Sequence, residues 1–348
     1  MLINLDFLKT GAAWPPPSER KRLETYRANR QLFEDEHGRV YAEQMKRIER
    51  VIGNFSRVVS FATILNYQKL MSLKIADLLF GEPPKFTAAK EDQQKVIDSV
   101  LSDTGLLDTA WHAAIDVSRY GDGLLLLSNQ NNCPTVEAVS PAYWFPVVDP
   151  ASIKRTKYHV FGWQYPIDPD SREWELKVQI HNPEDPLSCE QHTYKLNGAA
   201  GAWSIGPEIT LEQERMVETK LAACPVFRVS NVTASDRVYG IDDYQSIDSI
   251  VSELIIRVSQ VSRVLDKHAN PSMTGPKSAL EVDPNTGVWN FRVGEYFPRR
   301  DSSEPPLEYV TWDASMDANF RQIELLINQL YTISEMGSAI FGNLSNKT

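Results

Sequence analysis

Two stretches in the last third of the chain carry apolar residues at alternating spacings of four and three. The first consists of Ile247, Val251, Leu254, Val258, Val261 and Leu265. The second consists of Met316, Phe320, Ile323, Ile327 and Leu330. This spacing places the apolar side chains on one face of a helix. It predicts a helix over residues 242–268, roughly 40 Å long at about 1.5 Å per residue, with Asp242 or Asp243 as its cap. A second helix is predicted from about 315 to 336.

The first of these helices also carries apolar residues outside the face that the four-three spacing defines, which we call the seam. Its additional apolar residues are Ile250, Ile255, Ile256 and Val264. A polar stripe follows the same helix, made of Ser246, Ser249, Glu253, Gln260, Arg263 and Lys267. The pattern indicates two covered flanks and one face in water. Two interpretations remain open: a neighbouring copy covers the second flank, or the helix crosses the core of its own chain.

The residues between the two helices, 270–313, are predicted to form a small β unit. Residues 283–287 have turn chemistry between apolar flanks at Val282 and Val288. Beyond them, the apolar residues Trp289, Phe291 and Val293 alternate with polar ones. A long helix, a compact β insert and a returning helix are therefore the distinctive expected architecture.

The first 240 residues change from helical to β patterning. Helix signals cover residues 18–50, 55–79, 91–101 and 105–119, and an apolar strand follows at 124–127. Over 135–229 the pattern is β, as where Trp174, Leu176, Val178 and Ile180 alternate with polar residues. Turn signals occur at residues 168–170, 182–183 and 197–198. We therefore expect the α+β class, with one mixed helix-and-sheet domain over 1–240 and an antiparallel β meander over about 124–230.

Composition narrows the possible functions. The 36 Lys and Arg against 46 Asp and Glu give a formal charge of -10, which disfavours tight static DNA binding. The same charge is compatible with a conduit through which DNA slides. No run approaches the roughly 20 apolar residues of a membrane span, and Asp6 and Lys9 argue against a secretory signal. The three cysteines have no CxxC spacing, which favours reduced thiols in a cytosol-like compartment.

Catalytic signatures are not found in the sequence. It has no Walker GxxxxGK[ST], HExxH, GxSxG or GxGxxG pattern, so we expect no enzyme activity, no cofactor and no metal. His181 and His192, on adjoining strands, are expected to be surface residues or to pack across strands, in preference to binding a metal. An acidic group, Asp236, Asp242, Asp243 and Asp248, could bind a divalent cation, but helix capping accounts for most of it. A carboxylate-pair hydrolase or nuclease is a weak third possibility, because no acidic pair stands out.

Three stretches occur in a distinctive order. The first runs from Asn66 and ends in Leu79-Phe80-Gly81-Glu82-Pro83-Pro84. The second is Tyr120-Gly121-Asp122-Gly123, followed by a strand, Val139-Ser140-Pro141 and Phe145-Pro146-Val147. The third is Tyr239-Gly240-Ile241-Asp242-Asp243-Tyr244-Gln245-Ser246-Ile247-Asp248-Ser249-Ile250, which leads into the long helix. Their order, together with the order of segments over most of the chain, resembles the portal proteins, or head-tail connectors, of siphophage-type tailed bacteriophages.

The resemblance implies a structural ring of about a dozen copies at one capsid vertex. Residues 1–240 would be the wing, 241–269 and 314–342 the two stem helices, and 270–313 the clip. Double-stranded DNA would pass through non-specifically during packaging and ejection. The implied partners are the terminase large subunit, head-completion or adaptor proteins, and the major capsid and scaffolding proteins. The protein would assemble in the host cytoplasm and reside in the virion. In the family a tunnel loop and crown usually follow; residues 343–348 offer nothing on which to place them.

The resemblance also nominates residues. Candidates for the channel-facing stem are Glu253, Gln260, Arg263 and Lys267, if the polar stripe faces inward. Candidates for clip contacts to the motor are Tyr296, Phe297, Arg299 and Arg300, with solvated charge as the alternative for the arginines. The alternative function is a non-channel scaffold or adaptor that binds partners through a helical hairpin with a β tip. High-order cyclic assembly would distinguish the two.

Overall fold

The computed structural model describes residues 1–52, 62–130, 133–168, 172–199, 201–269 and 316–338, and four short strands between 273 and 309. Over these residues the chain is mixed α+β, which confirms the expected class. It divides into two compact units. Unit 1 comprises Met1–Ala42, Ile64–Val251 and Leu330–Thr348, and unit 2 comprises Glu43–Thr63 and Ser252–Gln329. No helix in the described residues has both the length and the apolar character needed to cross a membrane.

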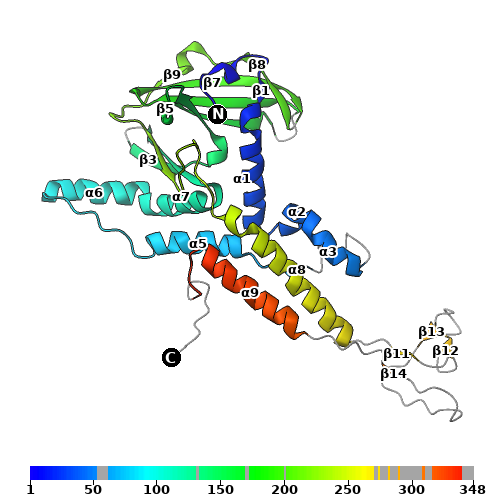
Figure 1. Cartoon of the computed structure of the whole chain (residues 1–348). Helices are drawn as coiled ribbons and strands as arrows, with labels where there is room; N and C mark the ends of the chain where they lie inside the picture. The colour runs from blue at the N-terminus through cyan, green and yellow to red at the C-terminus, as the bar shows by residue number, and fades with distance from the viewer. Residues whose placement is uncertain are drawn as a thin grey trace, which may run out of the picture. The chain divides into compact units, whose positions relative to one another are not determined.

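A curled antiparallel sheet, called the large sheet, forms one layer of unit 1 (Figure 1). In the described residues it has seven strands: β1 (Ala13–Trp14), β4 (Trp144–Asp149), β5 (Ser152–Pro166), β6 (Trp174–Asn182), β7 (Asp185–Ala199), β8 (Ala202–Glu208) and β9 (Met216–Glu218). The predicted alternation in β6 is confirmed, because Leu176 and Val178 are completely buried in the main core. These side chains belong to the same core cluster as Phe145, Val160 and Trp203 from other strands of the large sheet.

A three-stranded antiparallel sheet, called the small sheet, lies against the large one. Its order is β10 (Val226–Ser230), β2 (Asp122–Gln130), β3 (Cys133–Ala138). One face packs on the large sheet, where Leu124 and Val226 meet Trp144 and Phe161. The opposite face meets α7 (Leu106–Tyr120), since a Cβ on Gly123 would clash with Val117 and Ala113 of that helix. Unit 1 therefore stacks the large sheet, the small sheet and α7 in that order.

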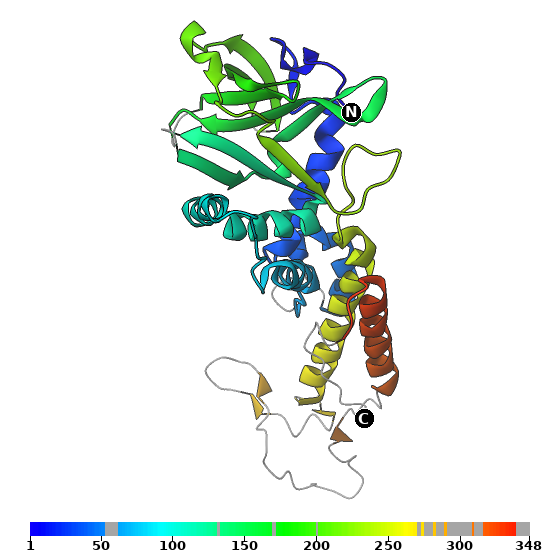
Figure 2. The same cartoon turned by 90° about the vertical axis from the view of Figure 1, so that its left-hand side faces the viewer.

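The remaining helices of unit 1 are α1 (Arg20–Phe33), α2 (His37–Val40), α5 (Tyr67–Phe80) and α6 (Glu91–Thr104). Figures 1 and 2 show α5 alongside α7, and buried Ala76 of α5 packs with Ala114 and Ile115 of α7. The predictions over 91–101 and 105–119 are confirmed as α6 and α7, divided by Gly105 in the left-handed region.

Two local predictions were wrong. Within the described residues, the helix expected over 55–79 begins at Tyr67, where Asn66 caps it by accepting from the Lys69 amide at 2.8 Å. Residues 62–66 are not helical, and 53–61 lie outside the described residues. The turn expected at 197–198 falls inside β7 instead: Gly198 pairs with Trp203, and the chain reverses around Gly201, whose φ is 90°. The turn at 182–183 is confirmed between β6 and β7.

The first long helix is confirmed as α8 (Tyr244–Ala269), with Asp242 accepting from the Gln245 amide at 2.9 Å. In its seam, Ile247, Val251 and Leu254 are fully buried, Val261 is buried and Val258 is half-buried. Ile255 and Ile256, which lie off the seam, are also buried within the single chain. The interpretation that the helix crosses its own core therefore accounts for these two residues without a neighbouring copy.

The second long helix is confirmed as α9 (Asp317–Ile333). In unit 2 it runs beside α8, and α3 (Ala42–Ile52) lies on another side of α8 (Figures 1 and 2). Leu330 is fully buried, whereas Ile323 and Ile327 are half-buried. Phe320 and Leu265 are 52% and 53% exposed within one chain, and their packing in the stem stays a prediction. The less exposed face of α9 follows Asn319, Ile323, Leu326 and Leu330, which leaves Phe320 at its margin.

The insert between α8 and α9 contains two described strand pairs. β12 (Glu281–Val282) pairs with β13 (Trp289–Asn290), with Val282 opposite Trp289, which agrees with the β structure predicted for the insert. β11 (Met273–Thr274) pairs with β14 (Glu308–Tyr309) and so joins the two ends of the insert. The candidate contacts Tyr296, Phe297, Arg299 and Arg300 lie outside the described residues.

Candidate functional site

The start of α8 is held by a close approach of two glycines. Gly121 follows α7 with a φ of 83°, and Gly240 precedes α8. A Cβ atom at position 240 would lie 1.9 Å from the Gly121 carbonyl oxygen, and one at 121 would lie 2.6 Å from the Gly240 carbonyl. Only glycine fits such an approach. The segment that follows α7 and the segment that precedes α8, which are far apart in the sequence, therefore meet in space.

Asp122 joins the same two segments through a buried carboxylate. It is 0% exposed and accepts hydrogen bonds from Arg228 Nε and Ser230 Oγ, both at 2.8 Å, and from the Gly240 amide at 3.0 Å. The Arg228 guanidinium also lies 5.0 Å over the Trp144 ring. A buried charge with several charged and polar donors is well compensated, and removing a partner is costly. Asp122 of the small sheet therefore holds Gly240, which precedes α8, by a hydrogen bond to its amide.

A second buried pair ties α1 to the same region. Arg22 donates from Nε to Glu19 at 2.9 Å and from Nη2 to the Trp144 carbonyl at 2.9 Å. Tyr239 donates its hydroxyl to Glu19 at 2.7 Å, and the Arg22 guanidinium lies 4.4 Å over the Tyr239 ring. Burial raises the pKa of Glu19, but Arg22 and Tyr239 outweigh it and leave that pKa below its ordinary value. The sequence alone assigns no role to this pair, because nothing local links residues 19 and 239.

The first turns of α8 rest on a polar network. Asp248 accepts from the Tyr41 hydroxyl and from Gln68 Nε2, each at 3.0 Å, and His37 Nε2 lies 3.3 Å from Gln68 Oε1. Tyr244 shares a 2.9 Å hydrogen bond with Ser72 of α5. Burial raises the pKa of Asp248 and lowers that of His37. These contacts fix the helix to α2 and α5 through buried side chains.

The predicted acidic group is divided among separate roles. Asp242 caps α8, whereas Asp243 accepts from Asn231 Nδ2 at 2.6 Å, and burial raises the pKa of both carboxyls. Asp236 is exposed. Within the described part of the chain, no three or more His, Cys, Asp or Glu side chains gather closely enough to hold a metal ion. The observed hydrogen bonds agree with capping.

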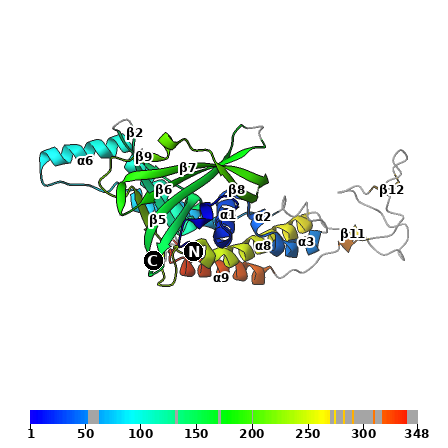
Figure 3. The ribbon, with the colours of Figure 1, turned by 90° about the horizontal axis from the view of Figure 1, so that it is seen from above.

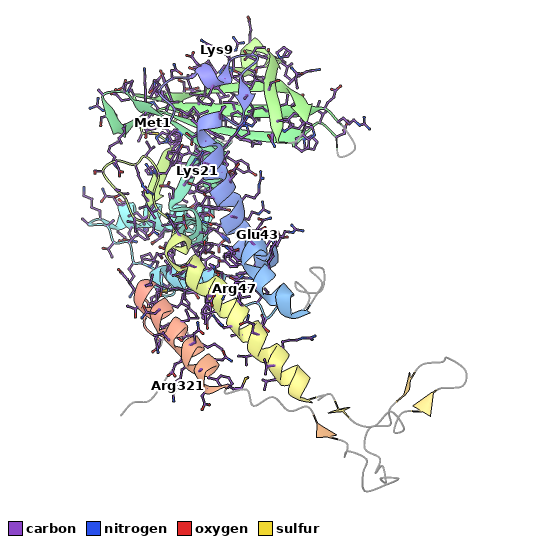
Figure 4. All side chains as sticks on the ribbon, turned by 45° about the vertical axis from the view of Figure 1, so that its right-hand side comes forward. Met1, Lys9, Lys21, Glu43, Arg47 and Arg321 are labelled. Atoms are coloured by element: carbon purple, nitrogen blue, oxygen red, sulfur yellow. The ribbon has the colours of Figure 1, made fainter. Side chains whose placement is uncertain are left out.

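Part of the polar stripe of α8 faces α3 within unit 2. Glu253 accepts from Arg47 Nη1 at 2.5 Å and from Arg257 Nε at 2.7 Å. Figure 4 labels Arg47, which belongs to α3. Burial raises the pKa of Glu253, but these two arginines outweigh it and leave the pKa below its ordinary value. Gln260 accepts weakly from Arg257 at 3.5 Å, and Arg263 is half-buried. The side chain of Lys267 lies outside the described residues, and the channel-facing role of the stripe stays a prediction.

His181 and His192 lie in different surroundings. His181 is buried, with Nε2 3.7 Å from Cys189 Sγ, and burial lowers its pKa to about 4. Burial also raises the pKa of the Cys189 thiol to about 12, so this cysteine stays protonated. His192 instead lies 2.8 Å from Glu208. These contacts are the cross-strand packing that the sequence predicted.

Taken together, the contacts around 239–248 fix the start of a 26-residue helix in unit 1. Comparison with models of known protein families finds none that matches the chain, and comparison with curated proteins also finds no match.

Proposed function

We propose that this chain is a portal subunit of a tailed bacteriophage, which forms a ring of about a dozen copies around a DNA channel at one capsid vertex. The observation that carries the proposal is the order of parts: an α+β body, a helix of 26 residues fixed at its start, a β insert and a returning helix. In this proposal residues 1–240 form the wing, 241–269 and 314–342 the stem, and 270–313 the clip.

The meeting of the portal-like stretches supports the proposal further. The Gly121 and Gly240 approach and the Asp122 carboxylate fasten the long helix to the body at the point where wing would pass into stem. A stem that lines a channel must keep its position while DNA moves past it. Fixing its base by backbone contact and buried charge meets that need better than a flexible linker does.

The proposed role is structural and not catalytic. The terminase large subunit would supply the motor, and head-completion proteins would bind the clip after packaging. Along the polar stripe, Gln260, Arg263 and Lys267 are the proposed channel-facing residues. Glu253 has its charge balanced by Arg47 and Arg257, so its contribution to the channel would be weaker.

The mass of the full chain in solution tests this proposal. Native mass spectrometry, over a range of protein concentrations and at two salt concentrations, should show one closed species of about a dozen copies. A monomer or dimer as the largest species under all conditions would overturn the portal assignment. It would favour the adaptor alternative, in which one or two copies bind a partner through the hairpin.

A further inference from the structure

Helix α6 exposes apolar side chains on one face. Among its 14 residues none is buried, and Val96 and Val100 are 62% and 38% exposed. With about 3.6 residues per turn, Asp92 and Asp103 lie on the same face as these two valines. We call Asp92, Val96, Val100 and Asp103 the α6 face. An isolated helix of this length is marginal in water, and helices in proteins are stabilised mainly by packing of an apolar face.

A second apolar surface lies at the edge of the small sheet. β10 is the outer strand, and Phe227, Val229 and Val232 are 52%, 52% and 55% exposed. An outer strand with exposed apolar residues is a natural site of association. We call Phe227, Val229 and Val232, together with the neighbouring Lys154 and Arg237, the β10 edge.

The charges of the two surfaces are opposite. On α6, Lys95 forms a salt bridge with Glu91 at 3.2 Å. Its positive charge therefore offsets the charge of Glu91 and not that of Asp92 or Asp103 on the α6 face. Near the β10 edge, Lys154 donates to the carbonyl oxygens of Ala234 and Arg237, which places its ammonium beside the loop that follows β10. The exposed Arg237 adds a second positive charge, against one acid, Asp236. Such complementarity steers association and fixes its register.

The two surfaces belong to opposite edges of one small sheet. α6 lies beside β3, the strand farthest from β10, and it extends away from the sheets (Figures 1 and 3). The α6 face and the β10 edge are therefore kept apart within a copy but are free to meet between copies. A head-to-tail contact of this type repeats and closes into a ring when its rotation permits.

We propose that the α6 face of one copy docks on the β10 edge of a second copy of this chain. The partner is another copy because the complementary apolar and charged surfaces both occur on this protein and lie at opposite edges of the small sheet, where a head-to-tail neighbour can join them. The inference rests on the proposed ring and names the contact that would build its outer part.

Charged substitutions on the α6 face test this contact. Val96→Lys combined with Val100→Lys places two positive charges in the proposed apolar contact, where they would also repel Lys154 and Arg237, and should raise the dissociation constant of assembly at least about tenfold. The matched control is Ser102→Lys, an exposed position on another side of the same helix. The control should assemble like the unmodified chain. Circular dichroism and thermal unfolding verify that both variants fold, as expected for positions that are not buried.

Cysteine cross-linking in the full chain supplies a readout independent of stability. Val100→Cys and Phe227→Cys are introduced together, with Cys133 and Cys224 replaced by alanine, while the buried Cys189 is kept. Mild oxidation should link copies into a ladder of multimers. The control pair, Ser102→Cys with Phe227→Cys, should give a several-fold lower yield.

The outcomes separate this inference from the proposed function. Rings that form equally well in the charged variant, without the cross-link, overturn the contact and leave the portal proposal standing. Cross-linked dimers or open filaments without rings support the contact and overturn the portal proposal. A chain that neither assembles nor cross-links overturns both.

Discussion

The substitution Gly240→Ala tests how α8 is fixed to the body. The added Cβ would lie 1.9 Å from the Gly121 carbonyl oxygen and 3.3 Å from the Asp122 carboxylate. Relief of the first contact requires the backbone to separate by about 1 Å, since carbon and oxygen atoms in contact lie more than about 3 Å apart. The Gly121 carbonyl also accepts from the Asn231 amide at 2.9 Å, so its displacement strains a second connection.

The expected cost follows from this geometry. Overpacking a side chain typically costs about 1–3 kcal/mol, and here the obstacle is backbone and not a movable side chain. We expect the upper end, about 3 kcal/mol, for the loss in free energy of unfolding. For a cooperative unit of about 150–250 residues this corresponds to a Tm lower by roughly 6–12 °C.

Scanning calorimetry of the full chain measures this effect. The control is Gly337→Ala, a position where an added Cβ meets nothing within 4 Å, and it should shift Tm by less than about 2 °C. If Gly240→Ala behaves like its control, the two glycines do not touch and the described base of α8 is wrong. A large loss for both variants would instead indicate a general sensitivity to glycine replacement.

Three further predictions concern the sheets and the long helices. Burial lowers the pKa of His159 and of His181 to about 4 from 6.5, so the unfolded chain binds more protons than the folded chain between these pH values. The free energy of unfolding should therefore fall as pH decreases from about 6.5 to about 4. His181→Phe should reduce this pH dependence in urea unfolding, and an unchanged pH dependence would contradict the prediction. Leu330→Ala should lower the free energy of unfolding by about 2–5 kcal/mol, because the Leu330 side chain is fully buried. Leu325→Ala should lower it by less than about 0.5 kcal/mol, because Leu325 is 58% exposed. Equal losses for the two variants in chemical denaturation would refute the orientation of α9. A double-mutant cycle of Arg47→Ala and Glu253→Ala should give a coupling free energy of about 0.5–1 kcal/mol, a modest value because Arg47 is 48% exposed. A coupling free energy of zero would show that this ion pair does not join α3 to α8.

The long helices could be predicted because their signal is local and periodic. The spacing of Ile247, Val251 and Leu254 reports a helical face regardless of what covers it, and Asp242 is a capping residue adjacent to that face. The alternation around Leu176 identified β6 for the same reason. The turn after β7 was placed at the wrong glycine. The Asn197-Gly198 pair has the chemistry of a turn, but the chain reverses at Gly201.

The base of α8 could not be predicted because its contacts join residues that are remote in sequence. Tyr239 and Glu19 are 220 positions apart, and Arg228 meets Asp122 across 106. A single sequence gives no signal that a buried carboxylate and a distant arginine are partners. Likewise, Arg47 has the sequence context of one charge among many on a solvated helix, and only the fold places it beside Glu253.

Electron microscopy of the purified full chain tests the central claim most directly. The portal account predicts ring-shaped particles with about a dozen-fold symmetry and a central hole wide enough for a DNA duplex to pass. Class averages that show only compact particles without a hole, at concentrations where the protein is folded, would contradict it.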